Sequence, residues 1–306
     1  MHTVLLTGAT GFIGSHILEA LLCAGYKVIA LKRSSSNLWR IEGKNTNVIY
    51  IDIDVTPIES IFDLNRIDAI VHLATLYKKN DDISSIDDML TANVSLPAKL
   101  LEIGVKNGVR AFINTGSFYE YDCTRIPVTE NTEIKPFNFY AKTKLAFEMF
   151  LSTYQEKIAI NSFRLFSPYG EKDNEKLIPM IIQKSLKGEQ ITLSEGLQKI
   201  DLIYVSDIVD AYILSLKDIL SEDREVGYEI YNLGSGTATS VRDVVSVIEQ
   251  HIGVPIDKVW GDASALDYPI VIADTTKLKN TLNWEPKITL HQGIANTIEY
   301  YKKRIQ

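Results

Sequence analysis

The amino-acid sequence predicts an α/β fold in which a doubly wound parallel sheet carries helices on both faces. Two observations predict this class. The first half alternates short β-branched runs with longer amphipathic segments, and a glycine-rich turn joins the first run to the first amphipathic segment. Near-continuous apolar runs are typical of strands buried on both faces, and their alternation with helical periodicity is typical of parallel sheets.

The elements of the first half follow one another regularly. The expected strands are 4–7, 27–31, 48–51, 69–72, 111–115 and 160–165, and the expected helices are 12–25, 56–63, 86–107 and 139–156. Each expected strand is shorter than eight residues, and each except the last is β-branched or apolar throughout most of its length. This order predicts the sheet before any motif is considered.

The second half is organised more loosely. After about residue 165, helical segments at 175–187, 240–252, 276–281 and 289–303 are separated by short strands and turns. The apolar run 202–205 and a helix over 206–219 are expected to return to the main sheet. We therefore expect a Rossmann-type domain of residues 1–165 plus about 200–222, and a smaller, discontinuous lobe of about 166–199 and 223–306 whose size suits a substrate-binding role.

Composition excludes several classes of protein. The 306 residues carry a net charge of −7, which provides no basic surface for nucleic acid. Cys23 and Cys123 are too few for a disulfide framework, and the five histidines show no metal-binding spacing, so no metal is expected. No apolar run reaches the ~20 residues of a membrane span, and the N-terminus shows no export signal. We expect a cytoplasmic protein without membrane contact.

The glycine-rich turn is the first candidate site. Glycines at 8, 11 and 14 follow the first expected strand and open the first helix. Such a turn lets the backbone approach a pyrophosphate at a helix N-terminus, whose dipole favours anions. The candidate cofactor-binding residues here are Gly8, Thr10, Gly11, Phe12, Ile13 and Gly14.

The end of the second expected strand indicates which dinucleotide binds. An acidic residue about 20 positions beyond the glycines would hold the ribose hydroxyl of NAD, but none occurs between Glu19 and Glu42. Lys32, Arg33 and Ser34 offer cations and a hydroxyl suited to a 2′-phosphate. NADP(H) is therefore the favoured cofactor, with NAD as the alternative.

A tyrosine and a lysine form the second candidate site. Tyr140 and Lys144 are four residues apart at the start of an expected helix, so they share one face. We expect the ammonium of Lys144 to lower the pKa of Tyr140 and make it a usable proton donor or acceptor. Ser117 follows an expected strand, where its hydroxyl could hydrogen-bond the substrate oxygen that Tyr140 protonates.

Together these motifs make the sequence similar to the extended short-chain dehydrogenase/reductases that act on nucleotide sugars. The resemblance covers nearly the whole chain. The residues that carry it are TGATGFIG at 7–14, HLA at 72–74, NV at 93–94, the Ser117 segment, Tyr140 with Lys144, RLFSPYG at 164–170, DLIYVSD at 201–207, YNLG at 231–234 and LNWEP at 282–286.

The resemblance implies roles for particular residues. Ser117, Tyr140 and Lys144 would be catalytic, and Lys144 would also hold the nicotinamide ribose. Asp52 and Ile53 would flank the adenine. The further cofactor residues implied are Leu73, Ala74, Thr75, Asn93 and Thr115, and the substrate-binding residues implied are Thr75, Ser117, Phe118, Tyr119, Ser167, Lys176, Leu177 and Lys199.

Departures from the family pattern narrow the reaction. Dehydratases of the family place an acid and a base where Phe118 and Tyr119 stand, and epimerase-reductases related to fucose synthase place a cysteine at position 119. Cys123 is expected to pack or to point to solvent. The family's diphosphate-binding asparagine is Ser167 and its usual arginine is Ile200. Dehydration and enolising epimerisation are therefore disfavoured, and Lys199 or Lys176 could supply the missing charge.

The resemblance and these departures predict an NADPH-dependent reductase of a nucleotide-diphosphate-linked 4-keto-6-deoxy sugar, similar in character to CDP-abequose or CDP-paratose synthases. The alternative is a 4-epimerase with the same Ser–Tyr–Lys set; epimerases retain NAD tightly, which the basic loop disfavours. Other carbonyl reductases and an inactive NADP-sensing protein remain further possibilities. A homodimer is expected, paired through segments 86–107 and 139–156.

Overall fold

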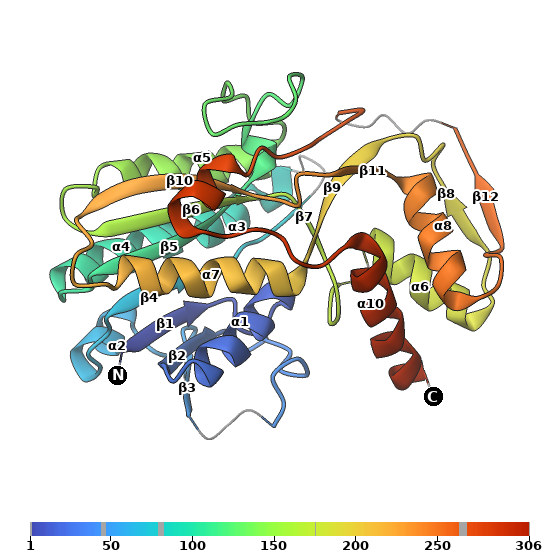
Figure 1. Ribbon diagram of the computed structural model, residues 1–306. Helices are drawn as coiled ribbons and strands as arrows, with labels where there is room; N and C mark the ends of the chain where they lie inside the picture. The colour runs from blue at the N-terminus through green and yellow to red at the C-terminus, as the bar shows by residue number, and fades with distance from the viewer. Residues whose placement is uncertain (1, 44–46, 79–82, 175, 263–267, 306) are drawn as a thin grey trace.

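A seven-stranded parallel sheet forms the centre of the larger lobe (Figure 1). The computed structural model describes residues 2–43, 47–78, 83–174, 176–262 and 268–305. The strand order is β10-β6-β5-β4-β1-β2-β3, the doubly wound order that the sequence predicts. The strands are β1 (Thr3–Thr7), β2 (Lys27–Lys32), β3 (Val48–Asp52), β4 (Ala69–His72), β5 (Ala111–Ser117), β6 (Ala159–Leu165) and β10 (Gly227–Leu233).

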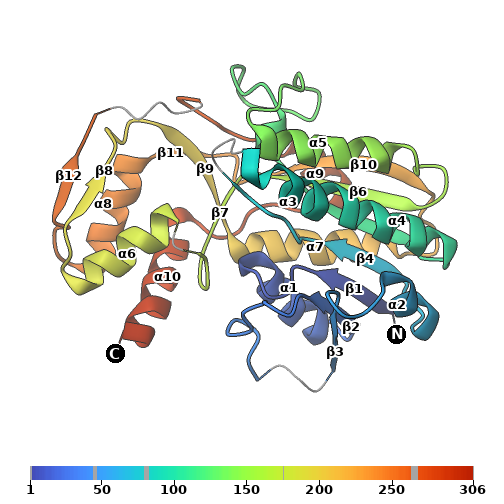
Figure 2. The ribbon, with the colours of Figure 1, turned by 180° about the vertical axis from the view of Figure 1, so that it is seen from behind.

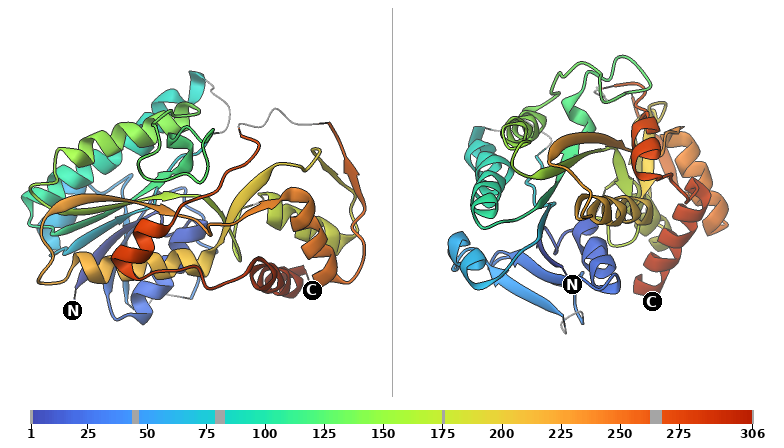
Figure 3. Two further views of the ribbon diagram at one scale, coloured as in Figure 1. Left: turned by 45° about the horizontal axis from the view of Figure 1, so that its top comes forward. Right: turned by 60° about the vertical axis from the view of Figure 1, so that its left-hand side comes forward.

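Helices cover both faces of this sheet (Figures 2 and 3). Because side chains alternate along a strand, Val4 and Leu6 of β1 join one apolar core while Leu5 joins the other. The first core includes α1 (Phe12–Cys23), α7 (Val205–Ile219) and α9 (Thr276–Leu282), and the second includes α2 (Ile58–Leu64), α4 (Leu96–Lys106) and α5 (Phe139–Ser152). Burial on both faces explains the near-continuous apolar runs of the sequence.

The smaller lobe lies beside the carboxyl ends of the sheet strands, on the right in Figure 1. It contains a two-stranded sheet and a three-stranded sheet, order β11-β9-β7, with a separate apolar core. The predicted helix 175–187 begins at Leu177, and residue 175 lies outside the described residues. The elements are β7 (Ser167–Tyr169), α6 (Leu177–Lys187), β8 (Ile191–Leu193), β9 (Lys199–Tyr204), β11 (Ala238–Ser240), α8 (Val241–Ile252), β12 (Lys258–Trp260) and α10 (Leu290–Ile305).

The expectation that the run 202–205 returns to the main sheet is wrong, whereas the helix after it, α7, does pack on that sheet. Residues 202–204 belong to β9, which pairs with β7 and β11 in the three-stranded sheet, and Val205 begins α7. The strand that completes the main sheet is β10, which pairs with β6 in parallel and lies within the range 223–306 expected for the smaller lobe. Since β10 is an edge strand with a half-buried first half, it lacks the continuous apolar run of the inner strands. The remaining division into lobes stays a prediction.

The expected continuous helix at 86–107 is also interrupted. It consists of α3 (Ile86–Leu90), a π-helical turn (Thr91–Ser95) and α4, in whose first turn Pro97 lies. Proline has no amide hydrogen, so it cannot donate the helical bond to position 93. The wider turn places Asn93 inward, where it is buried.

Among the residues described, no helix combines the length and the apolar character that a bilayer crossing requires.

Candidate active site

The glycine turn is built by close contacts that only glycine permits. Gly8 has a φ of 72°, and the Gly11 amide donates to the Gly8 carbonyl at 2.9 Å. A Cβ on Gly14 would lie 2.0 Å from the Gly8 oxygen, so α1 packs directly onto the turn. Gly11 is the N-cap of α1 and provides no side-chain cap. The first amides of this helix therefore have no capping side chain, as an anion-binding turn requires.

The ends of β1 and β4 meet at this turn. The Thr7 hydroxyl accepts the amides of Leu73 and Ala74 at 3.1 and 3.0 Å, and a Cβ on Gly8 would lie 2.8 Å from the Ala74 nitrogen. The predicted residues Leu73 and Ala74 thus lie against the glycine turn, at the carboxyl edge where doubly wound sheets bind ligands. The start of α1 has no capping side chain, and the glycine turn leaves no room for a Cβ at Gly8 or Gly14. Both features fit the pyrophosphate of a nicotinamide dinucleotide.

The basic segment at the end of β2 contacts an acidic side chain of the protein, whereas the sequence predicts that it contacts a 2′-phosphate. Lys32 Nζ lies 3.0 Å from Asp52 Oδ2, and the Ser34 hydroxyl donates to the same oxygen at 2.8 Å. These contacts hold the pKa of Asp52 below its usual range. Arg33 is exposed, and its guanidinium forms no hydrogen bond or ion pair within the part of the chain that the structure describes. Ile53 follows, with its amide donating to the Lys32 carbonyl at 2.9 Å.

Ser117, Tyr140 and Lys144 converge at the end of β5. Ser117 is the last residue of β5, and Asn138 caps α5 by accepting the Ala141 amide at 2.9 Å, which fixes the turn that carries Tyr140. Lys144 Nζ donates to the Thr115 carbonyl at 3.0 Å. All three predicted catalytic side chains are at least nine-tenths buried.

The expected effect of Lys144 on Tyr140 is wrong. Burial raises the pKa of Tyr140 above its usual value and Glu120 raises it further, while hydrogen bonds with Thr75 and Ser117 lower it. The Lys144 nitrogen lies 5.9 Å from the Tyr140 ring centroid and is turned toward Thr115. The phenol therefore keeps its proton at neutral pH. Burial lowers the pKa of Lys144 to about 8.

Asn93 and Thr115 hold the framework around this site. Asn93 Oδ1 accepts the Thr75 hydroxyl at 3.0 Å and the Leu76 amide at 2.8 Å, and its amide group donates to Thr143 at 2.9 Å. The Thr115 hydroxyl donates to the His72 carbonyl at 2.8 Å. Both predicted cofactor residues thus tie β4 and the segment after it to β5 and α5.

Apart from Thr75 and Ser117, which belong to the catalytic group, the predicted substrate residues divide into two groups. Phe118 and Tyr119 directly follow Ser117, with ring centroids 4.2 Å apart, and Tyr119 neighbours Phe137 at 5.8 Å. They form an apolar wall beside the catalytic residues. The other four lie in the smaller lobe: half-buried Ser167 on β7, exposed Lys176 and half-buried Leu177 at the start of α6, and exposed Lys199 on β9.

Two buried carboxylates were missed by the sequence analysis as site residues. Glu120 accepts the Ser117 amide at 2.6 Å, an arrangement that the spacing S-x-x-E at 117–120 could have revealed as a capping box. Asp201 accepts the amides of Ser235, Gly236 and Ala273 at 2.6, 3.0 and 2.9 Å, and so joins β9 to two later segments.

Cys123 packs behind Phe118, whose carbonyl its thiol reaches at 3.7 Å. Cys123 is buried, which raises the pKa of its thiol to about 12 and makes it a poor acid–base group at neutral pH. Within the described ranges, no group of three or more His, Cys, Asp or Glu side chains is placed to hold a metal ion.

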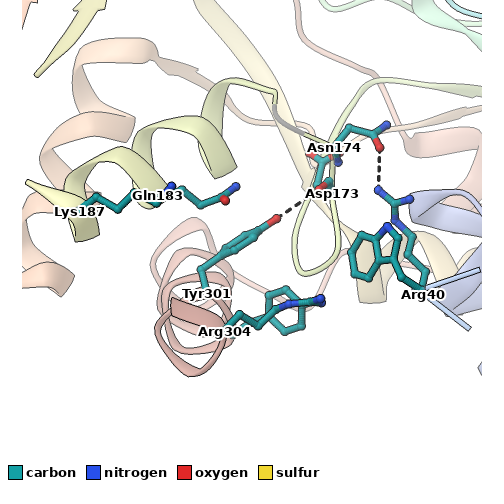
Figure 4. A pocket seen from close by; sticks show the side chains of 9 residues that line it. Arg40, Asp173, Asn174, Gln183, Lys187, Tyr301 and Arg304 are labelled. Atoms are coloured by element: carbon teal, nitrogen blue, oxygen red, sulfur yellow. Dashed lines mark hydrogen bonds between the residues drawn. The ribbon is translucent and has the colours of Figure 1, made fainter. Parts of the chain in front are cut away.

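A hollow of about 580 Å³ lies between the lobes, and its lining contains none of the predicted catalytic residues (Figure 4). Arg40 donates to Asn174 at 2.7 Å across it, and the Trp39 ring has Arg40 at 4.4 Å and Arg304 at 4.5 Å. Since two of its cations already contact protein groups, this hollow is a seam that joins the loop after β2 to the smaller lobe.

The fold and the Ser–Tyr–Lys arrangement define an NAD(P)-dependent enzyme of the extended short-chain dehydrogenase/reductase type. The model of the NAD dependent epimerase/dehydratase family matches residues 4–234. The chain belongs to this family.

Comparison with individual proteins gives relatives over almost the whole chain. CDP-abequose synthase of Salmonella muenchen is 30% identical, covering 96% of this chain and 96% of its own. UDP-glucuronate 4-epimerase of Thermodesulfobacterium geofontis is 28% identical, covering 99% of this chain and 97% of its own. The crystal structure of UDP-glucose 4-epimerase with UDP-glucose from Thermotoga maritima superposes with a TM-score of 0.89 at 27% identity, over 99% of this chain and 100% of that one.

Proposed function

We propose that this protein reduces the carbonyl group of a nucleotide-diphosphate-linked 4-keto-6-deoxy sugar with NADPH. The observation that carries the proposal is the buried, protonated Tyr140, which contacts Ser117 and Thr75. Reduction of a carbonyl requires a proton donor at neutral pH, and a tyrosine hydroxyl beside a hydrogen-bonding serine is placed to be that donor. Phe118 and Tyr119 follow Ser117 without adding an acid–base pair of the kind that dehydration requires.

The chain's own residues perform the proton chemistry. A nicotinamide dinucleotide whose pyrophosphate is held at the glycine turn would supply the hydride. Tyr140 donates its proton to the oxygen of the former carbonyl, and the Ser117 hydroxyl orients that oxygen by a hydrogen bond. Lys144, held by the Thr115 carbonyl, places a positive charge beside the site when protonated.

The substrate class is supported by the apolar wall and the relatives. Phe118, Tyr119 and Phe137 offer rings rather than charges beside Ser117, which suits the methyl group of a 6-deoxy sugar better than a carboxylate. The Salmonella muenchen relative is a CDP-abequose synthase, and several others are UDP-sugar epimerases. Ser167, Lys176, Leu177 and Lys199 are proposed to contact the nucleotide diphosphate.

A UDP-sugar 4-epimerase is the second candidate, because relatives at 26% and 28% identity carry that name. An epimerase must first remove a proton from the substrate hydroxyl. The raised pKa of Tyr140 does not separate the two reactions, because an epimerase must also return a proton to the same oxygen. The exposed Arg33, which suits the 2′-phosphate of NADPH, is the observation that favours a reductase over an epimerase with tightly held NAD.

The test is NADPH oxidation by the purified protein with CDP-, dTDP-, GDP- and UDP-linked 4-keto-6-deoxy sugars. Oxidation with one of these substrates is expected. Absence of oxidation with all of them, together with interconversion of a UDP-hexose and its 4-epimer without net cofactor turnover, would establish the epimerase instead.

NADPH is proposed as the preferred cofactor, on the strength of the exposed Arg33. We expect Arg33→Ala to reduce kcat/KM for NADPH by about 10- to 100-fold through loss of a charge-assisted contact with the 2′-phosphate, with little change for NADH. The measurement is the ratio of kcat/KM for the two cofactors, with Arg66→Ala as the control because its side chain is 92% exposed.

Asp52 is the observation that favours NAD, since its carboxylate accepts from both Lys32 and Ser34. A wild-type preference for NADH that Arg33→Ala leaves unchanged would contradict the NADPH proposal and assign the ribose contact to Asp52.

A homodimer through the segment from α3 to α4 and through α5 is also proposed. A cytoplasmic location stays a prediction. Leu90, Met149 and Phe150 are 40%, 67% and 46% exposed on these helices, which lie side by side in Figure 2. Burial of such side chains contributes about 1.5–3 kcal/mol each, so we expect Met149→Glu with Phe150→Glu to weaken association by about 100-fold or more. Light scattering should give a dimer mass for the wild type and a monomer mass for the variant; a wild-type monomer would refute the dimer.

A further inference from the structure

One arginine side chain contacts both lobes across the seam between them. The guanidinium of Arg40 donates through Nη1 to the Thr10 carbonyl at 3.4 Å, within the glycine turn. Its Nε donates to the Lys172 carbonyl at 2.8 Å, in the loop after β7. Its Nη2 donates to Asn174 Oδ1 in the same loop at 2.7 Å (Figure 4). Because a guanidinium carries several N–H donors in a fixed planar geometry, this one side chain joins the glycine turn to the loop 171–174.

The position of Arg40 is fixed from the side of the larger lobe. The next residue, Ile41, is 3% exposed and belongs to the apolar core that includes α1. Its amide donates to the Leu38 carbonyl at 2.9 Å, which closes a turn around Arg40. The Trp39 ring centroid lies 4.4 Å from the guanidinium carbon. Since the backbone is anchored and the guanidinium is stacked on a ring, Arg40 loses less side-chain entropy in making its contacts than a free arginine would.

The loop that Arg40 holds leads directly into α6. Lys172 has a φ of 62°, a conformation that residues other than glycine adopt rarely and that persists where the surroundings impose it. The Lys172 ammonium donates back to the Arg40 carbonyl at 3.3 Å. Further along, the amide of Lys176, the N-cap of α6, donates to the Asn174 carbonyl at 2.6 Å. A displacement of this loop would therefore move the start of α6, where Lys176 and Leu177 are proposed to contact the nucleotide diphosphate.

The same loop has two further contacts that do not involve Arg40. His16 of α1 donates from Nε2 to the Glu171 carbonyl at 2.9 Å. The Tyr301 hydroxyl of α10 donates to the Asp173 carbonyl at 3.2 Å. We therefore expect a shorter side chain at position 40 to loosen the loop from the glycine turn without unfolding the protein.

We propose that Arg40 is a positioning residue that sets the start of α6 relative to the glycine turn. This inference rests on the proposed function for the two ligands, whereas the link between their sites is made by this chain alone. Arg40 touches neither ligand in this account, so it acts through the loop 171–174. Because hydride transfer depends on the distance between the nicotinamide and the carbonyl carbon, a displacement of about 1 Å between the two sites is enough to slow the reaction.

The first test compares kinetic constants. Arg40→Ala is expected to raise the KM for the sugar nucleotide by about 10-fold and to lower kcat by about 10-fold, because the two ligands are no longer held at the right distance. The dissociation constant for NADPH is expected to stay within about 3-fold, since the glycine turn keeps its own hydrogen bond from Gly11 to Gly8. Arg40→Lys keeps the charge but loses the planar set of donors, so it is expected to resemble Arg40→Ala.

Position 174 provides a matched pair of variants for the same contact. Asn174→Leu removes the acceptor of Arg40 Nη2 and is expected to raise the KM for the sugar nucleotide by about 3-fold. Asn174→Asp keeps an acceptor oxygen and is expected to match the wild type. A KM that rises equally in both variants would show that the hydrogen bond to Arg40 is not what positions the loop.

The second test requires no ligand and measures amide hydrogen exchange. The amides of Asp173, Lys176 and Met180 are hydrogen-bonded to carbonyls of the loop and of its neighbours in the chain, so their exchange rates report on the loop and the first turn of α6. In Arg40→Ala these rates are expected to rise by about 10-fold, while the amides of α1 exchange as in the wild type.

The outcomes separate this inference from the proposed function. Failure of every sugar nucleotide to support turnover would refute the proposed reduction, while the exchange rates still test Arg40. Wild-type exchange rates in Arg40→Ala, or a lowered unfolding midpoint with unchanged kcat and KM, would overturn the inference. If Arg40→Ala does not fold, Asn174→Leu is judged by the same exchange rates. Arg110→Ala, which removes an exposed arginine just before β5, is the control and is expected to leave all of these quantities unchanged.

Discussion

Replacement of Tyr140 by phenylalanine is expected to lower kcat by about 10²- to 10⁴-fold, the usual contribution of a positioned general acid. The substitution removes only the hydroxyl. Since the ring is 9% exposed and packs edge-on against Tyr77 at 4.9 Å between centroids, phenylalanine fits the same space. NADPH affinity should stay within about 3-fold, because the phenol contributes a proton to the reaction rather than most of the binding energy.

The measurement is steady-state NADPH oxidation together with a fluorescence titration of NADPH. Tyr154→Phe is the matched control: it removes a hydroxyl that donates to Glu102, beyond the end of α5 and away from Ser117. That variant is expected to keep most of the activity. A Tyr140→Phe enzyme that retained more than about a tenth of the wild-type kcat would show that another group donates the proton.

The sequence predicts best those strands whose residues are apolar because both faces of the strand are buried. Strands β1, β2, β4, β5 and β6 are buried on both faces, so their apolar runs identify them to within about two residues. β10 lies at the sheet edge with a half-buried first half, and its sequence resembles that of any short strand. Its place in the sheet depends on pairing with β6, a long-range contact that local periodicity cannot report.

The sequence predicts which residues lie together at the candidate site better than it predicts their pKa values and charge contacts. The four-residue spacing of Tyr140 and Lys144 correctly predicts that they share a helix face, but it cannot predict that Lys144 turns toward the Thr115 carbonyl. Nor does it account for burial, which outweighs the neighbouring ammonium in setting the pKa of Tyr140. In the same way, the basic residues after β2 give no indication that Lys32 meets Asp52, which lies 20 positions later.

The motif that contains Glu120 predicts neither its burial nor its ion pair. A carboxylate in a predicted strand-to-helix turn is ordinarily exposed to solvent, whereas this one is buried against Arg164 and the Ser117 amide. The S-x-x-E spacing indicates the capping contact but not the ion pair, because Arg164 is brought to Glu120 by the pairing of β5 with β6.

Substitution of Gly14 by alanine is expected to abolish tight NADPH binding and to destabilise the fold. The added Cβ would lie 2.0 Å from the Gly8 oxygen and 2.7 Å from the Gly8 carbonyl carbon, so backbone must move at the turn. Overpacking against backbone costs about 3 kcal/mol or more, which corresponds to a fall of about 6 °C or more in the unfolding midpoint. The measurements are the thermal midpoint and a fluorescence titration of NADPH.

Gly11→Ala provides the matched comparison, because a Cβ there meets only the Gly8 oxygen, at 3.1 Å, within 4 Å. Gly11 caps α1 in an extended conformation with a φ of −79°, which alanine adopts readily. We therefore expect Gly11→Ala to unfold within about 2 °C of the wild type but to bind NADPH at least about 10-fold more weakly, since its methyl group faces the turn where the pyrophosphate is proposed to lie. If Gly11→Ala bound NADPH as tightly as the wild type, the pyrophosphate would not approach this turn. Loss of stability with unchanged NADPH affinity in Gly14→Ala would make the glycine a packing requirement of α1 alone.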